Sequence, residues 1–297
     1  MVNKKYKIID PHIHLFDLSK GQYQWLHPNN PPFGSDKHII QKSFTERDLT
    51  LNSHFTLEGI VHIEAGFDNE FPIKEINLLK STITQTPFKA IAFIDMALPA
   101  KKFNAQLTHL QSHCKSLLIG IRHIMEGDDI DLIFNENILS NLTTLAEKNL
   151  IFEAQFEIHD LKSTEQLTYY ANNLPNLKIV INHCGLVTKD KYHLWQRAVT
   201  ILSSLSNIHI KCSGWEMDNR QYEQLWLQKI INHLINSLGE NRIMLASNFP
   251  LCLFSKSYTD LWQSYLDLNL PNNIWQAISF DNAKDIYRVA ATPSIRV

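Results

Sequence analysis

The sequence predicts an α/β protein built as a single (β/α)8 TIM barrel over residues 1–297, with a long loop at residues 17–58 after the first strand. Three observations predict this fold. About eight short runs rich in Ile, Val and Leu recur along the chain. Segments with apolar residues at three- and four-residue steps separate these runs, as in amphipathic helices. A length of 297 residues and a hydrophobic content of 44% are enough for a barrel of about 250 residues with a full core.

The individual elements are assigned from these runs and from the residues that end them. The predicted strands are residues 7–14, 59–65, 89–97, 117–124, 150–156, 178–185, 208–214 and 242–248. The clearest predicted helices are residues 72–85, 138–148 and 222–238. The last of these runs into the letters SLG, and a glycine there is typical of a helix C-terminus.

The connection at residues 17–58 is unusually long and rich in proline and asparagine, which argues against a regular helix. In a barrel it would lie at the carboxyl end of the strands, where long loops usually bind ligands. Tyr23, Trp25, Leu26 and Phe33 give it apolar anchors, which favours a packed loop over a disordered excursion. We expect Trp25 to cover the face of a substrate ring.

Composition narrows the function to small-molecule chemistry. The formal net charge is −2 and the charged residues are scattered, so no basic face for nucleic acid is expected. No apolar run reaches the length of a membrane span or a signal peptide, and the four cysteines are far apart in the sequence. We therefore expect a cytoplasmic protein with free thiols, a small-molecule substrate and no membrane partner. The sequence does not indicate an oligomeric state.

Polar side chains gather at the predicted carboxyl ends of the strands, where a (β/α)8 barrel holds its site. His12 and His14 lie two residues apart in one strand and therefore share a face. The other members of this ring are Glu64, Arg122, Gln155, His183, Lys211 and Asn248. Because a barrel interior normally fills with apolar residues, such a ring needs a substrate, a metal ion or mutual pairing to satisfy it.

Three histidines are the strongest candidates for chemistry. His12, His14 and His183 end strands that would face one mouth, and imidazoles this close can ligate a cation or bracket one substrate group. The isolated His62 and His123 are instead expected to be hydrogen-bonded structural residues.

Arg122 and Lys211 could each have a substrate-binding role or a structural one. Arg122 suits a carboxylate or a polyhydroxylated substrate, but it could equally form a salt bridge with Glu64 or Glu153. Lys211 could bind substrate or pair structurally with a neighbouring carboxylate. Glu64 and Gln155 complete the predicted substrate-binding group.

Several motifs in order resemble one protein family. They are DPHIHLFD, YQWL, GIRH, NHCG, KCSG, SNFP and FDNAKDIY, spread from about residue 8 to about residue 288. Together they resemble the amidohydrolase superfamily, and more narrowly its amidohydrolase-related lactonase branch, with sugar-lactone hydrolases and 2-pyrone-4,6-dicarboxylate lactonase. This resemblance implies a (β/α)8 barrel and hydrolysis of a small cyclic ester. It also implies that His12, His14, His183 and position 248 converge on a metal or on the substrate.

Position 248 departs from the family pattern, in which an aspartate acts as general base. Asn248 has no titratable carboxylate, so it cannot take a proton from water at neutral pH. Three explanations remain open: a histidine such as His183 is the base, a metal held by the three histidines activates water, or the protein binds without catalysis.

We favour a working lactonase over a non-catalytic lactone or sugar-acid binding protein, because idle polar groups at strand ends are costly. The rival within the same superfamily is a metal-dependent decarboxylase of aromatic acids. For the cofactor, we expect either no tightly bound metal or one divalent, zinc-type ion held by His12, His14 and His183. The first is favoured because an anionic ligand is missing at position 248.

Overall fold

The computed structural model describes residues 5–289, and its one named sheet has eight parallel strands in the order of the sequence. The strands are β1 (Tyr6–Ile13), β2 (Phe55–Ile63), β3 (Phe88–Phe93), β4 (Leu118–Ile124), β5 (Ile151–Gln155), β6 (Ile179–Ile181), β7 (Ile208–Cys212) and β8 (Ile243–Leu245). Every predicted strand is present. The predicted α/β barrel is therefore confirmed.

The ring of strands closes between its last and first members. The backbone N–H of Asn248 donates to the carbonyl of His12 at 2.9 Å, and the N–H of His14 donates to the carbonyl of Phe249 at 2.7 Å. These bonds lie just beyond β8 and at the end of β1, so they bring the polar ends of the two strands into register.

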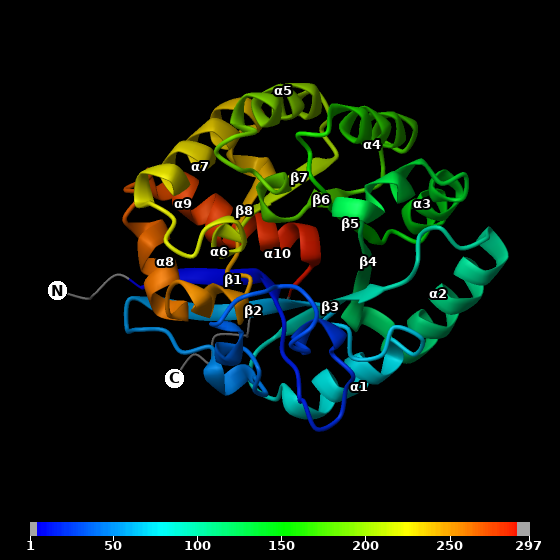
Figure 1. Ribbon diagram of the computed structural model, residues 1–297, viewed down its shortest axis with the longest axis horizontal. Coiled ribbons are helices and arrows are strands. Elements are labelled where there is room, and N and C mark those ends of the chain that lie inside the picture. Colours follow the sequence, from blue (N-terminus) through cyan, green and yellow to red (C-terminus); the bar gives the residue numbers. More distant parts are fainter. Residues whose placement is uncertain (1–4, 290–297) are drawn as a thin grey trace, which may run out of the picture.

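Helices surround this ring, as Figure 1 shows. The α-helices are α1 (Ile73–Thr82), α2 (Ala100–Cys114), α3 (Ile138–Glu147), α4 (Leu161–Asn173), α5 (Tyr192–Ser203), α6 (Trp215–Asp218), α7 (Gln224–Leu238), α8 (Tyr258–Leu266), α9 (Asn272–Gln276) and α10 (Asn282–Tyr287). Shorter helical turns are η1 (Gln24–Leu26), η2 (Lys37–Ile39), η3 (Glu46–Asp48), η4 (Lys115–Leu117), η5 (Gly127–Phe134), η6 (His183–Gly185), η7 (Glu240–Arg242), η8 (Leu251–Phe254) and the π-helical η9 (Ala277–Asp281). All three predicted helices are found, and Gly239 follows α7 with a φ of 83° that suits glycine.

The barrel interior is apolar at the end away from the polar strand termini. Ile9, Val61 and Ile151 belong to a buried cluster that also contains Phe280 and Tyr287 from the C-terminal helical segment. That segment packs against β1 and β8. The chain thus fills one end of its own barrel, which leaves the carboxyl ends of the strands as the place for a pocket.

The long connection after β1 differs in part from its prediction. It contains the short turns η1 to η3 rather than a regular helix, as expected, but β2 begins at Phe55, before the predicted residue 59. Phe55 extends the strand because it is buried and pairs with Tyr6. Tyr23 and Leu26 are buried anchors as predicted, whereas Phe33 is 69% exposed and anchors nothing.

The sixth strand is shorter than predicted. It ends at Ile181, and residues His183 to Gly185 form the turn η6 instead of continuing to residue 185. His183 and Cys184 have φ values of 53° and 55°, a left-handed conformation that a β-strand cannot contain.

Candidate active site

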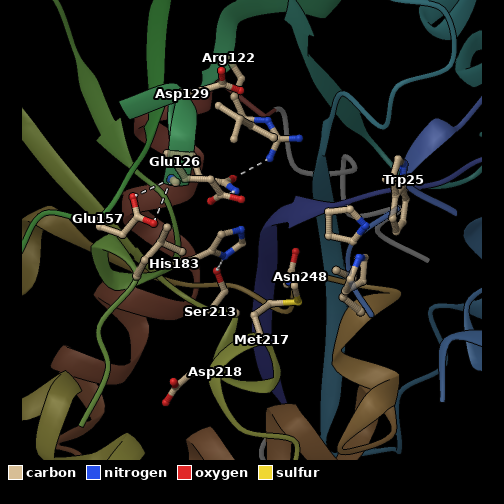
Figure 2. A pocket seen from close by; sticks show the side chains of 18 of the residues that line it. Trp25, Arg122, Glu126, Asp129, Glu157, His183, Ser213, Met217, Asp218 and Asn248 are labelled. Carbon is tan, nitrogen blue, oxygen red and sulfur yellow. Dashed lines mark hydrogen bonds between the residues drawn. The ribbon is translucent and has the colours of Figure 1, made fainter. Parts of the chain in front are cut away.

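A cavity of about 1390 Å³ opens at the carboxyl ends of the strands. Most of the predicted site residues line it, namely His14, Trp25, Glu64, Arg122, Gln155, His183 and Asn248. Figure 2 shows His183, Ser213 and Asn248 near the centre of the pocket, with Trp25 on one side and Glu157 on the other. The structure therefore brings together residues that lie up to 234 positions apart (248 minus 14).

Trp25 reaches the pocket from the long loop. Its indole N–H donates to the carbonyl of Ala65 at 2.7 Å, and its ring packs near the rings of His14 and Phe16. A hydrogen bond and two ring contacts fix the indole as one wall of the cavity, the position in which a flat ring can cover a bound substrate.

His14 lies on the pocket surface, and its hydrogen bonding shows which ring nitrogen carries the proton. Its Nδ1 is 2.9 Å from the carbonyl oxygen of Ile63, and because a carbonyl only accepts, Nδ1 carries the proton. The Nε2 of His14 is therefore free to accept a hydrogen bond. Burial, assisted by the positive charge of Arg122, holds the pKa of His14 well below its ordinary value, so the ring is neutral at pH 7.

His12 lies beneath the pocket surface rather than on it. Its side chain is fully buried and its ring centroid lies 5.1 Å from that of His14 and 4.5 Å from that of His183. The ammonium of Lys211 is 3.5 Å from His12 Nδ1, which places the proton of the neutral imidazole on Nε2. Burial and then Lys211 hold the pKa of His12 well below its ordinary value. We therefore assign His12 to the support of the other two rings.

His183 is held in a strained turn. Its Nδ1 is 2.9 Å from the hydroxyl oxygen of Ser213, and a Cβ added at Gly214 would lie 2.7 Å from the same nitrogen. Only glycine leaves room for the imidazole there, and its φ of 74° also favours glycine. Burial, and secondarily the positive charge of Arg122, lower the pKa of His183 to about 3. The ring is thus neutral, and when Nδ1 carries the proton and donates to Ser213, Nε2 is left as an acceptor toward the pocket.

Arg122 forms a salt bridge with Glu64, one of the two roles that the sequence analysis gave it. Its Nη2 lies 2.7 Å from a carboxylate oxygen of Glu64, and its Nη1 donates to the amide oxygen of Gln155 at 3.1 Å. Burial raises the pKa of Glu64 above its ordinary value, although Arg122 opposes that rise. The charge of Arg122 is balanced, and Nε and Nη2 also donate to the carboxylate and the backbone carbonyl of Glu64 at 2.8 Å. At most two of its five N–H groups are therefore left to reach a ligand.

Lys211 does not line the pocket. Its ammonium lies 2.7 Å from both carboxylate oxygens of Glu153, and both side chains have no exposed surface. The hydroxyl of Tyr287 donates to the same carboxylate at 2.7 Å. Lys211 therefore has the structural role of pairing with Glu153, and the expectation that it binds substrate is not retained.

Asn248 is bonded to a residue that the sequence analysis missed. Its side-chain Nδ2 donates to Oε1 of Glu216 at 2.6 Å, and Glu216 on α6 is 1% exposed. Burial raises the pKa of Glu216 to about 7. No strand-end position marks Glu216 in the sequence; its only signal is that it follows the KCSG motif by two residues.

A second missed feature is an acidic rim around the pocket. Glu126, Asp129, Glu157 and Asp218 line the cavity, together with the single lysine Lys191. Figure 2 shows Glu126, Asp129 and Glu157 along one side of the pocket. Glu126, Asp129 and Glu157 follow strands in loops and turns, and Asp218 ends the four-residue helix α6, so hydrophobic periodicity does not mark any of them.

His62 and His123 are structural, as predicted. His62 accepts from the N–H of Leu15 at 3.2 Å and lies 3.0 Å from Glu75, while His123 accepts from the N–H of Met96 at 3.1 Å. His123 also borders the cavity, but its Nδ1 is occupied by this backbone bond.

The comparisons with known proteins agree with this geometry. Residues 142–289 match the sequence model of a family described as amidohydrolase. The resemblance to the amidohydrolases is thereby confirmed.

Among curated proteins, this amidohydrolase-like chain is 24% identical to L-rhamnono-gamma-lactonase of Scheffersomyces stipitis, over 96% of this chain and 99% of that protein. Among solved structures, an amidohydrolase from Burkholderia multivorans with bound zinc is 16% identical, with a TM-score of 0.77 over 96% of this chain and 100% of that one. A probable 2-pyrone-4,6-dicarboxylic acid hydrolase from Acinetobacter baumannii with bound citric acid is 15% identical, with a TM-score of 0.69 over 95% and 99% of the two chains. At these identities the solved structures show a shared fold.

The donor groups here do not suit a divalent metal. Within residues 5–289, no three His, Cys, Asp or Glu side chains are arranged to hold an ion. The chemistry of the donors also disfavours an ion: Lys211 Nζ lies 3.5 Å from His12 Nδ1, which favours the proton on Nε2, and Asn248 offers an amide in place of a carboxylate. We therefore derive no step of the chemistry through a metal.

Two further predictions concern the chain as a whole. Among residues 5–289, no helix combines the length and apolar character needed to traverse a bilayer. Cys114, Cys184, Cys212 and Cys252 are buried free thiols, as the sequence predicted.

Proposed function

We propose that this protein hydrolyses the ester bond of an uncharged, polyhydroxylated lactone, such as the lactone of a sugar acid. The observation that carries the proposal is the pair of neutral imidazoles, His14 and His183, on the surface of a large cavity next to Asn248. The similarity to a rhamnono-lactonase along nearly the whole chain supports it.

The chemistry follows from what each side chain can donate or accept. Nε2 of His183 accepts a proton from water as the water oxygen attacks the lactone carbonyl carbon. An N–H of Arg122 that is not bonded to Glu64 or Gln155 stabilises the negative charge that develops on the carbonyl oxygen. The bond to the ring oxygen then breaks, and the imidazolium returns its proton to that oxygen, so that one lactone and one water give one hydroxy acid.

The charge of the pocket supports a substrate without a carboxylate. Arg122 is already paired with Glu64, and Lys211 is paired with Glu153 below the pocket. The rim adds several carboxylates and only one lysine. A carboxylated ring such as 2-pyrone-4,6-dicarboxylate would therefore meet several carboxylates and, among the described residues that line the cavity, Lys191 as the one lysine. Hydroxyl groups can instead donate to these carboxylates.

The test is a panel of substrates with two variants. Neutral sugar lactones and a carboxylated pyrone are assayed by the acid released at constant pH, and 2,6-dihydroxybenzoate is assayed for carbon dioxide. We expect turnover of neutral lactones, a decrease of at least 100-fold in kcat for His183→Asn, and no change for the exposed His193→Asn. Thermal unfolding of all three proteins verifies that they fold.

Several results would contradict the proposal. Carbon dioxide release without ring opening would assign the protein to decarboxylation. Stabilisation by a lactone that never opens would indicate a binding protein. Full activity of His183→Asn would remove this histidine from the mechanism.

A further inference from the structure

Glu216 is a buried carboxyl group that the proposed reaction does not yet use. One of its oxygens accepts the 2.6 Å hydrogen bond from Asn248, and the other, Oε2, is buried without a hydrogen-bond partner among residues 5–289. Within residues 5–289, no Lys, Arg or His side chain forms an ion pair with the Glu216 carboxyl group. A buried carboxyl group with so few partners is costly, so its place beside the active site calls for a function.

The hydrogen bond fixes the orientation of the Asn248 amide. An ionised carboxylate can only accept, so Asn248 must turn its NH2 group toward Glu216. Its side-chain oxygen, for which residues 5–289 provide no hydrogen-bond donor, is then the atom left to the pocket that Asn248 lines. Asn248 itself has a φ of 59°, so its backbone is held in a left-handed conformation at the end of β8.

We propose that Glu216 is a positioning residue that holds Asn248 with its amide oxygen toward the pocket, where that oxygen accepts a hydrogen bond from the attacking water. The water then donates one hydrogen bond to Nε2 of His183 and the other to the amide oxygen of Asn248. These two bonds aim a lone pair of the water oxygen at the lactone carbonyl carbon. This inference rests on the proposed lactone hydrolysis for the identity of the water.

The groups around Glu216 explain why its neighbour at position 248 should be an uncharged amide. Arg220 lies near it, bonded to the Glu216 carbonyl oxygen, but its guanidinium also donates to Asp36. Tyr222 and Cys252 face it as well, and burial raises the pKa of both side chains, so they are neutral at pH 7. A second carboxylate at position 248 would therefore lie against Glu216, where Arg220, shared with Asp36, offsets the repulsion only in part.

Protonation of Glu216 would reverse the orientation of the amide. A protonated carboxyl can donate to the oxygen of Asn248, which frees the amide to present its NH2 group to the pocket instead. The pKa of Glu216, raised by burial to about 7, places this change in the neutral range. The pKa of His183, near 3, lies far below that range.

Four variants test the pair: Asn248→Asp, Glu216→Gln, the double variant Asn248→Asp/Glu216→Gln, and Glu223→Gln as a control. Glu223 is an exposed glutamate seven positions away, and its replacement should change nothing. We expect Asn248→Asp to lower kcat at least tenfold with little effect on KM, and the double variant to recover most of that loss. The wild-type rate should fall as pH decreases through about 7, and Glu216→Gln should lose this dependence.

A second readout separates this inference from the proposed function. The thermal midpoint of Asn248→Asp at pH 8 should be lower than that of the wild type and should recover in the double variant, whether or not a lactone turns over. The inference is overturned if the double variant is no better than Asn248→Asp in this measurement. It is also overturned if Glu216→Gln keeps the wild-type pH profile, which would trace the dependence to another buried acid such as Asp10. Loss of lactone turnover in the wild type, with the stability pattern retained, would overturn only the proposed function.

Discussion

The buried ion pair of Lys211 and Glu153 gives the sharpest test of the structural assignments. Lys211→Met removes the ammonium and leaves Glu153, within the described part of the chain, with only the Tyr287 hydroxyl as a hydrogen-bond donor. Both side chains have no exposed surface, so the remaining carboxylate would be an uncompensated buried charge. Removing one partner of such a pair costs about 3 to 5 kcal/mol of stability.

The expected shift in melting temperature follows from chain length. At roughly 2.1 cal/mol/K of unfolding entropy per residue, a chain of 297 residues loses about 5 to 8 °C for that change in free energy. Burial lowers the pKa of Lys211 to about 8 while Glu153 opposes this, so the measurement belongs at pH 7, where Lys211 is charged. The assay is urea unfolding followed by tryptophan fluorescence, with a thermal scan in parallel.

The matched control is Lys211→Met/Glu153→Gln, which removes both charges and keeps an acceptor for Tyr287. We expect it to recover at least half of the lost stability, because no unpaired charge remains. The reasoning would be refuted if Lys211→Met cost less than about 1 kcal/mol, or if the double variant were less stable than the single one.

Two further predictions concern the pocket wall and the buried acid. Trp25→Ala should raise KM for a lactone about fivefold with little change in kcat, because an aromatic contact of about 1 kcal/mol is lost. Steady-state kinetics measures both constants. A decrease confined to kcat would instead assign the loop a role in the chemical step. The pKa of Glu216 rises on folding from 4.5 to about 7 because of burial, so the folded state binds this proton more tightly and wild-type stability is lost as pH rises through that interval. The loss is about 3 kcal/mol. Glu216→Gln should show no such loss between pH 5 and pH 8 in urea unfolding, and an identical pH dependence in both proteins would contradict the assignment.

Much of the fold could be predicted because it depends on local patterns. Short apolar runs with helical periodicity between them specify strands and helices, and eight such units specify the barrel. The alternation of side chains along β1 likewise places His12 and His14 on one face. The prediction failed where the backbone leaves the regular pattern, as at His183 and Cys184, whose left-handed conformation no hydrophobic period reveals.

What the sequence determined by itself is therefore the barrel and the collection of polar groups at one end of it. Only the tertiary structure decided which of these groups are partners. Arg122 and Glu64 are 58 positions apart, as are Lys211 and Glu153, and both pairs depend on how neighbouring parts of the barrel are staggered. Glu216 meets Asn248 for the same reason, because the short helix after β7 brings a carboxylate to the end of β8. Periodicity tells which face a side chain takes, but a hydrogen bond needs a partner at about 3 Å, and that distance is set by the packing of the whole barrel.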